Sequence, residues 1–338
     1  MSLQPFTSLY RYAVEPIAPF TWFGTKVSSL DLVAVFRLCI ALRQMRENLY
    51  AKHQRSAGED RPALAEERSF VRDACAMLTI VFGGEAIIGP LLGILPSFML
   101  SGVFPGLYIA AQAIVEYIPV LPSASFSTEL PLSIIDGFTR AMLLCSLIPP
   151  PVIAHTSPVI ASSPWALLLS SLVITNGGFF LTNMFSFMEP TPLTLTTPDE
   201  LKPYGWTTTD IWSAPFITGL YALLTHAQPF WAELHSVIST VLGGAGSKVD
   251  PMDAESARAL CALILAALFS TRTAKNFGLI WKKMYEWSSG PGWLLDVPNY
   301  FSLPLGASMR LPPLSGYKFG AYPAVILFSF STAGALVV

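Results

Sequence analysis

The sequence is poor in charge, and this scarcity excludes several classes of protein. Of its 338 residues only 12% are Asp, Glu, Lys or Arg, whereas 52% are apolar and the mean hydropathy is +0.53. Such a composition is typical of helices that contact lipid and untypical of a soluble core. The net charge of -2 also provides no basic surface for a nucleic-acid partner. We therefore expect an all-α membrane protein.

Residues that carry catalysis or bind metal are equally scarce. The four cysteines stand singly in apolar stretches, so their spacing indicates neither a disulfide framework nor a zinc site. We interpret them as small buried hydrophobic side chains: Cys39, Cys75, Cys145 and Cys261. No two histidines lie four residues apart, and no Gly-rich phosphate loop is found. The sequence thus predicts no enzyme, no metal site and no resident cofactor. Arg11 and Glu15 interrupt the first twenty residues, so a cleaved signal peptide is not expected.

Long apolar runs are abundant. A helix that crosses a bilayer needs about 20 mostly apolar residues. Seven segments approach this length: 29–45, 73–94, 100–120, 130–152, 164–187, 209–227 and 256–274. The first is the weakest, because Asp31 and Arg37 lie inside it.

Basic residues collect in alternate connections. The region 46–72 is rich in Lys and Arg, and Arg272 and Lys275 begin a second basic region, whereas the connections on the other side hold only Lys248. By the positive-inside rule, 46–72 and the tail 275–338 are cytosolic and the segment 1–28 is non-cytosolic. The stretch 47–68 is of mixed charge and predicts a solvated loop with some helix.

The last 18 residues form an uncharged run. This segment, 321–338, is short for a span and contains Pro323. Three interpretations are open: an eighth crossing, an interfacial segment, or a tail without fixed structure.

The chain contains an internal repeat. Gly83 and Gly84 lie in the second span, and Gly177 and Gly178 occupy the matching place in the fifth. The two pairs are offset by three spans, an odd number, so the copies must be inverted in the membrane. The sequence therefore predicts seven transmembrane helices: two inverted three-helix repeats, 29–120 and 130–227, followed by a seventh helix, 256–274.

Two uses of the paired glycines are open. Small residues allow helices to pack closely in membranes. Alternatively, they kink each helix so that loosened carbonyls face a water-filled path. The polar residues Glu85, Thr175, Asn176 and Asn183 lie near these glycines and would line such a path.

Ionisable residues within predicted spans are costly in hydrocarbon, so each is a functional candidate: Asp31, Arg37, Glu85, Asp136, Arg140 and Asp210. Each also has a simpler interpretation. Asp31 and Asp210 stand near span starts, where a carboxylate caps a helix. Asp136 and Arg140 are four apart and could pair within their helix. An Arg140 that faces a lipid phosphate or a pore is the alternative.

The chain resembles the trimeric intracellular cation (TRIC) channel family. The resemblance is carried by Leu30 to Phe36, by Cys75 to Leu78 and Phe82-Gly83-Gly84, and by Pro90 to Gly93. It continues in Asn176-Gly177-Gly178 with Phe180 to Phe185, and in Thr207 to Asp210. It covers roughly 29–275. Where the family commonly has Lys-Glu-Val in its fourth helix, this chain has Arg140-Ala141-Met142, and Thr175 replaces a lysine that the family often shows.

The resemblance implies a homotrimer in an intracellular membrane, either the endoplasmic reticulum or the nuclear envelope. Each subunit would conduct potassium and other monovalent cations between its second and fifth helices, with Gly83, Gly84, Gly177 and Gly178 as kinks. The current would balance charge during calcium release and uptake, and a bound inositol phospholipid is implied, with Arg140 as its candidate contact.

A secondary transporter is the alternative, because inverted repeats serve both classes. A transporter needs a denser set of polar ligands near the midplane than the few residues around the glycines supply.

Overall fold

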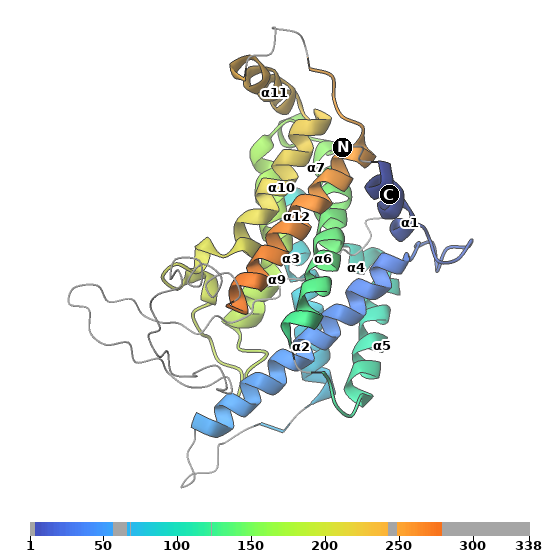
Figure 1. Cartoon of the computed structure of the whole chain (residues 1–338). Helices are drawn as coiled ribbons and strands as arrows, with labels where there is room; N and C mark the ends of the chain where they lie inside the picture. Colours follow the sequence, from blue (N-terminus) through green and yellow to red (C-terminus); the bar gives the residue numbers. More distant parts are fainter. Residues whose placement is uncertain (1–3, 57–65, 68, 123, 243–248, 279–338) are drawn as a thin grey trace, which may run out of the picture.

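The structure is a computed structural model that describes residues 4–56, 66–67, 69–122, 124–242 and 249–278 (Figure 1). Within these residues the protein is all-α, apart from two isolated β-bridges near the N-terminus, Pro16 with Ser28 and Trp22 with Thr25. The predicted apolar run 321–338 and most of the predicted cytosolic tail lie outside the described residues.

The longer helices follow the predicted spans within a few residues at most ends. They are α2 (Ser29–Ser56), α3 (Phe70–Leu92), α5 (Val103–Tyr117), α6 (Phe126–Met142), α9 (Pro164–Met184), α10 (Thr209–Thr225) and α12 (Ala254–Asn276). Shorter helices precede or connect them: α1 (Gln4–Val14) comes first, and α4 (Ser97–Leu100), α7 (Pro149–Ile153), α8 (Pro158–Ala161) and α11 (Pro229–Val241) lie between long helices.

Four helical stretches in the described part are long and apolar enough to cross a membrane: Phe70–Leu92, Phe126–Ile153, Pro164–Met184 and Ala254–Asn276. The chain therefore has the makeup of a multi-pass membrane protein. The other three predicted spans are also helical. However, α5 has 15 residues and α10 has 17, and α2 carries several charged side chains along its length.

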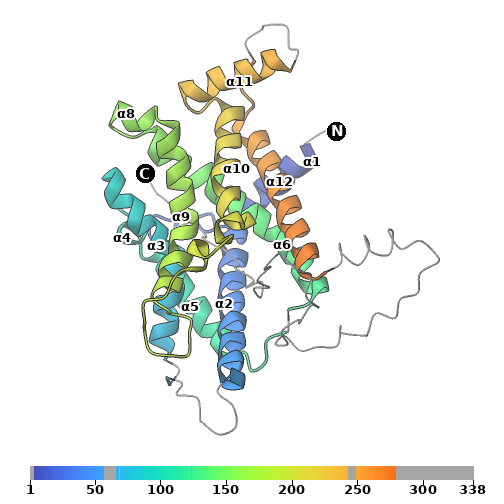
Figure 2. The same ribbon diagram turned by 90° about the vertical axis from the view of Figure 1, so that its left-hand side faces the viewer.

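The stretch 47–68, predicted to be a solvated loop with some helix, continues α2 as far as Ser56. Two other segments form helices that the sequence did not predict. The N-terminal segment forms α1, and the connection after the sixth predicted span forms α11. Both additional helices are shorter than the roughly 20 residues that a bilayer-crossing helix needs. They lie at the end of the bundle where α12 begins (Figures 1 and 2).

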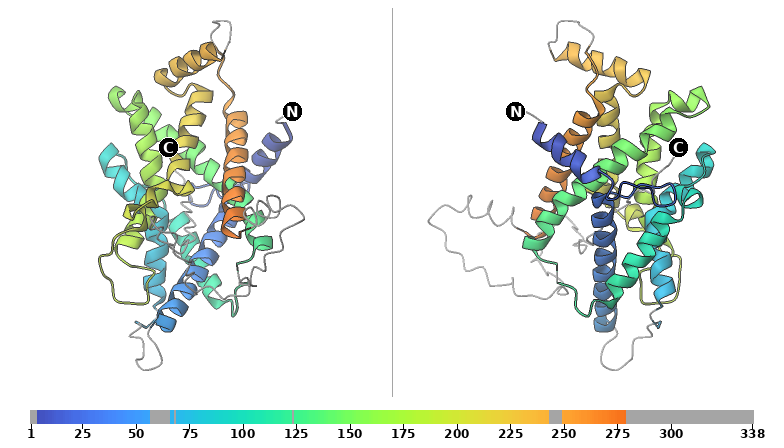
Figure 3. Two further views of the ribbon diagram at one scale, coloured as in Figure 1. Left: turned by 60° about the vertical axis from the view of Figure 1, so that its left-hand side comes forward. Right: turned by 90° about the vertical axis from the view of Figure 1, so that its right-hand side faces the viewer.

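Successive long helices run in alternating directions (Figures 1 and 3). Two pairs from distant parts of the sequence pack side by side, α3 with α9 and α6 with α12. One core lies among α2, α3 and α5, and another lies among α6, α10 and α12. Apolar side chains also face outward, among them Val71 and Leu91 on α3, Ile114 on α5 and Leu169 on α9. An apolar outer surface suits contact with lipid.

The fourth predicted span contains a π-helical turn, Leu143–Leu147, between α6 and α7. Pro149, Pro150 and Pro151 follow it. Prolines have no N–H, so the carbonyls that they would otherwise bind in an α-helix need other donors. The Ile148 N–H donates to the Leu143 carbonyl over 3.1 Å, which is the wider π pattern. The Leu144 carbonyl accepts from the Thr218 hydroxyl of α10 at 3.2 Å. Because Ile148 bonds to Leu143, the Leu144 carbonyl is left for Thr218, and this bond ties the π-helical turn to α10.

Candidate functional site

A row of buried polar residues follows one face of α6. We call it the α6 polar stripe: Glu129, Ser133, Asp136 and Arg140, all buried. Their separations of four, three and four residues place them on one side of an α-helix. Polar groups enclosed at this depth are costly unless partners satisfy them. The α6 polar stripe is therefore a candidate functional site.

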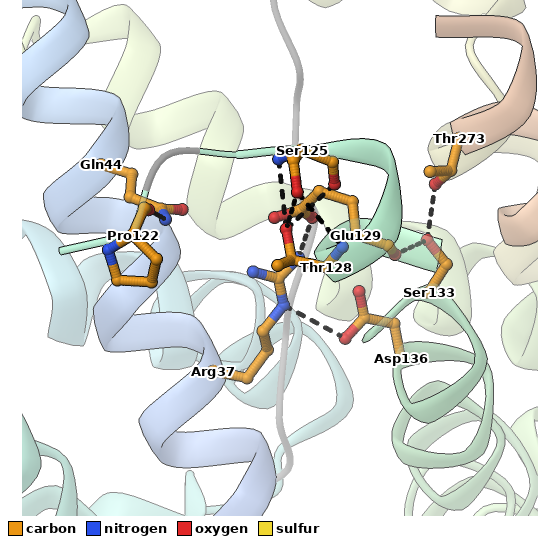
Figure 4. A network of polar contacts seen from close by, with 9 residues as sticks. All are labelled: Arg37, Gln44, Pro122, Ser125, Thr128, Glu129, Ser133, Asp136 and Thr273. Atoms are coloured by element: carbon orange, nitrogen blue, oxygen red, sulfur yellow. Dashed lines mark hydrogen bonds and ion pairs between the residues drawn. The ribbon is translucent and has the colours of Figure 1, made fainter. Parts of the chain in front are cut away.

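Arg37 of α2 faces the stripe (Figure 4). Its guanidinium lies 2.6 Å from Glu129 Oε2, and its Nε lies 3.8 Å from Asp136 Oδ1. The side chains of Arg37 and Glu129 are each only 3% exposed. Asp136 therefore lies within ion-pair distance of a residue on another helix, Arg37, while its pairing with Arg140 within α6 stays a prediction. These contacts of Arg37 join α2 to α6.

The other side of the stripe faces α12. Ser133 Oγ lies 2.5 Å from Thr273 Oγ1, and it donates to the Glu129 carbonyl at 2.7 Å. Arg272 of α12 donates to both carboxylate oxygens of Asp210 on α10, at 2.5 and 2.6 Å. From sequence, Asp210 could be explained as a helix cap alone. In the structure its pair with Arg272 joins α10 to α12.

Arg140 lies between these groups. Its side chain is buried, and Asp210, Arg272 and Asp136 are its electrostatic neighbours. Three arginines and three acids meet along the inner faces of α2, α6, α10 and α12, so their formal charges balance: Arg37, Arg140, Arg272, Glu129, Asp136 and Asp210. A neutral set of this kind can hold helices in position, and it can also rearrange to pass charge.

Asp31 is the cap that the sequence suggests. Its Oδ2 accepts from the Ser28 N–H at 2.8 Å and from the Ser28 hydroxyl at 2.7 Å, and Ser28 Oγ accepts from the Asp31 N–H at 3.2 Å. The reciprocal bonds satisfy the start of α2. The capping interpretation of Asp31 is confirmed.

The two glycine pairs meet where α3 crosses α9. A Cβ built on Gly83 would lie 3.0 Å from Gly178 Cα, and one on Gly177 would lie 2.9 Å from Gly84 Cα. Likewise a Cβ on Gly84 would lie 2.6 Å from Ile174 Cα. Both helices continue without interruption through this crossing. In this conformation the glycines serve close packing, the first of the two uses left open by the sequence.

The polar residues around the crossing bind close by: Thr175 and Asn176 within α9, and Glu85 to the next helix, α4. Thr175 donates to the Ser171 carbonyl, and Asn176 Nδ2 donates to the Leu172 carbonyl at 2.9 Å. Glu85 accepts from the Ser97 N–H at 2.9 Å and the Ser97 hydroxyl at 2.7 Å, at the start of α4.

Asn183 lies in the last turn of α9. Its carbonyl accepts from the Thr196 hydroxyl at 2.7 Å and from the Ser186 N–H at 3.2 Å. These bonds to the main-chain carbonyl fold the chain back after the helix, and neither of them involves the Asn183 side chain.

A second charged cluster joins α2, α3 and α5 at the opposite end of the bundle from α11. Arg46 contacts Asp73 and Glu116, while Arg43 donates to the Ile118 carbonyl at 2.6 Å. Arg72 at the start of α3 donates to the carbonyls of Glu189 at 2.8 Å and Thr191 at 2.9 Å. Several basic residues that set the predicted orientation therefore also fix helix ends.

The cysteines and histidines differ partly from expectation. Cys39, Cys145 and Cys261 are buried as predicted, but Cys75 is exposed. All four are free thiols. His226 Nε2 lies 2.9 Å from His235 Nδ1, which links the end of α10 to α11. Within the described residues, no group of three or more His, Cys, Asp or Glu could hold a metal ion.

Sequence reasoning missed Glu129, Ser133 and Arg272 as members of the charged site. The first two were open to detection, because their spacing from Asp136 and Arg140 has the period of one helix face. In the sequence, Arg272 stands out only as the start of the basic region after the seventh predicted span. Its pairing with Asp210 depends on the packing of α10 against α12, which no local pattern reveals.

Comparison with protein-family models, curated proteins and solved structures gives no match for this chain.

Proposed function

We propose that the protein is a monovalent cation channel of the TRIC type that conducts potassium. The observation that carries the proposal is the glycine crossing of α3 and α9. Gly84 approaches Ile174 and Gly178 approaches Ile80, and these are equivalent residues when the two glycine pairs are aligned. Such reciprocal contacts are what a two-fold relation between two repeats produces.

The proposed architecture is seven crossings: two inverted three-helix repeats, 29–120 and 130–227, and a seventh helix that corresponds to α12. The alternating helix directions support it. In this proposal the short helices α5 and α10 cross the bilayer together with the segments at their ends. The charged side chains of α2 contact protein partners such as Glu129 and Glu116.

In this proposal the crossing is the constriction of the conducting path. The two helices meet through backbone and small residues, so their separation breaks few side-chain contacts. Glu85 and Asn176, both half-buried beside the glycines, then become available to hydrated cations. We place the channel in the endoplasmic reticulum or nuclear envelope as a homotrimer, on the resemblance to the TRIC family.

An inositol phospholipid is part of the proposal, with Arg140 as its candidate contact. Arg140 is only 3% exposed, and it lies near Asp210 and Asp136. A headgroup therefore reaches Arg140 only if α6 and its neighbours move apart. Lipid binding at this residue would act on helix packing.

A secondary transporter is the second candidate, and the buried charges favour it. The α6 polar stripe with Arg37, Asp210 and Arg272 supplies the denser set of ionisable groups that a transporter needs. Transport would then couple solute binding to rearrangement of these ion pairs.

Ion flux in proteoliposomes tests the proposal and separates the two candidates. The full chain is reconstituted with and without an inositol phospholipid, and potassium release is followed with an internal fluorescent indicator. With a protonophore present to balance the charge, a channel releases potassium down its gradient without a coupled solute, and it passes sodium in place of potassium. Empty liposomes are the control.

A transporter gives a different result. Flux that requires a coupled ion or solute on one side would contradict the channel and support the second candidate. Equal release of chloride and potassium would contradict the proposed cation selectivity.

A further inference from the structure

Helix α11 runs across the end of the bundle, whereas α10 and α12 run along it (Figure 2). Only the segment 226–228 separates α11 from α10. The Met252 N–H donates to the Leu224 carbonyl at 2.8 Å, so the chain that leads into α12 lies beside the last turn of α10. Helix α12 is a candidate span that begins at Ala254. The boundary of the bilayer on this side therefore lies close to the level of α11.

The start of α11 is anchored to the bundle, which fixes the direction of its faces. Trp231 is buried, and a Cβ built on Gly219 of α10 would lie 3.3 Å from its ring. Trp231 Nε1 donates to Gln228 Oε1 at 3.0 Å, and Gln228 Nε2 donates to the Ala161 carbonyl at 2.6 Å. Leu234 packs against the same apolar cluster as Trp231. Trp231 and Leu234 therefore mark the side of α11 that is turned towards the bundle.

The opposite side of α11 is polar. Its residues follow one another at intervals of three and four, which is the spacing of one helix face, and all are exposed: Glu233, Ser236 and Thr240. Glu233 is also the only Asp, Glu, Lys or Arg of this helix. Because Trp231 lies on the other side of the helix, this polar face is turned away from the bundle and towards water.

The second half of α11 carries apolar side chains that the described protein leaves exposed. We call them the α11 apolar strip: Val237, Ile238 and Val241, which are 58%, 36% and 79% exposed. Ile238 follows Trp231 by seven residues, and Val241 follows Leu234 by seven, so each lies two turns further along the same side of the helix. The strip therefore continues the bundle-facing side beyond the part that the bundle covers.

We propose that the α11 apolar strip lies in the lipid of the membrane interface, in the leaflet on this side of the bundle. A helix with one apolar and one polar face lies in the plane of the membrane surface, with its apolar face about 5 to 10 Å inside the headgroup and acyl boundary. The occupant is lipid because the strip points back towards the layer that the candidate spans α9 and α12 cross.

The lipid is held by apolar contact, since the strip contains no polar side chain, and an anionic headgroup is not required. The inference requires only that the chain be embedded in a membrane. It therefore stands apart from the proposed conduction.

Nitroxide spin labels on single cysteines of the full chain test this contact. The exposed Cys75 is first replaced by alanine, and the other three cysteines are buried. Val237→Cys and Val241→Cys place the label on the strip, and Ser236→Cys and Thr240→Cys are matched controls on the polar face of the same turns. All four side chains are exposed, so the label does not disturb the core.

The labelled proteins are reconstituted in phosphatidylcholine liposomes. Collisions of each label with oxygen, which concentrates in lipid, are compared with collisions with a water-soluble nickel complex. We expect oxygen to exceed the nickel complex at V237C and V241C, and this order to reverse at S236C and T240C. Addition of phosphatidylglycerol to the liposomes should leave the pattern unchanged.

Three results would overturn the proposal. Equal access of the nickel complex to all four labels would place the strip in water. Shielding of V237C and V241C from both reagents, with an immobilised label, would identify a protein contact, such as a second copy of the chain. Lipid contact only in the presence of phosphatidylglycerol would contradict recognition by apolar contact.

Discussion

Single buried residues determine how the helices of this protein are joined. Arg37 lies within an apolar helix and was recognised from sequence as costly, yet its partner was not, because Glu129 is 92 positions away along the chain. Asp31 could be predicted, since its bonds to Ser28 are local. Residues with local partners are thus readable from sequence, while the α6 polar stripe becomes visible only when α2 and α12 are packed against it.

The Arg37–Glu129 pair gives the first prediction. Arg37→Met or Glu129→Leu alone should lower the free energy of unfolding by about 3 to 5 kcal/mol, because each leaves a buried charge without its main partner. The double variant should lose much less than the sum of the two. Thermal unfolding in detergent of all four proteins measures this coupling. Additive losses would show that the pair does not connect α2 to α6.

The start of α12 gives a prediction about pH. The Ser256 N–H donates to Asp253 at 2.8 Å, and this hydrogen bond holds the pKa of Asp253 below its ordinary value of 3.8. Because the pKa is lower in the folded protein, the stabilisation is present above pH 3.8 and is lost as the pH falls below it. Asp253→Asn retains a cap without titrating.

Carboxyl groups ordinarily titrate between about pH 5 and pH 3. Over this interval the melting temperature should therefore fall more steeply in wild type than in D253N. Circular dichroism melts across this interval measure the difference. Parallel curves for the two proteins would contradict the capping role of Asp253.

Helices and their crossings form the next scale. Most long helices were predictable to within a few residues, since long apolar runs are a strong signal. The segments α1 and α11 were missed because they are short. The glycine pairs were recognised, but sequence alone could not decide between packing and kinking. The continuous helices and the short distances at the crossing favour packing in this conformation.

The crossing gives the third prediction. Gly84→Ala would place a Cβ 2.6 Å from Ile174 Cα, so α3 and α9 must separate, at a cost of about 1 to 3 kcal/mol. Gly106→Ala is the matched control, because nothing lies within 4 Å of a Cβ on this α5 glycine. It should be neutral or stabilising by up to about 1 kcal/mol. Unfolding in detergent compares the two, and equal effects would contradict the close approach of α3 and α9.

The loop after α9 gives the fourth prediction. Arg72 donates to the carbonyls of Glu189 and Thr191, and the Glu66 N–H donates to the Pro190 carbonyl at 2.8 Å. Arg72→Gln removes a donor that several carbonyls share, so amide hydrogen exchange should accelerate in residues 186–196. Lys202→Gln, which removes an exposed cation nearby in the sequence, is the control. Unchanged exchange in R72Q would show that other contacts hold this loop.

At the scale of the whole molecule, the all-α class and the multi-pass character could be predicted from composition. This prediction does not depend on the exact ends of single helices. The proposed internal symmetry rests on sequence and structure together: repeated glycines in the sequence indicate it, and their reciprocal contacts support it. Which ion the proposed channel would conduct depends on the width and polarity of a path between helices, which side-chain identity alone does not determine.

Single-channel recording of the purified full chain in planar bilayers, with an inositol phospholipid present and a potassium gradient applied, tests the proposed function most directly. We predict discrete current steps that reverse near the potassium equilibrium potential, persist when sodium replaces potassium, and are unaffected by replacement of chloride. Absence of steps under these conditions, or reversal at the chloride potential, would contradict a monovalent cation channel.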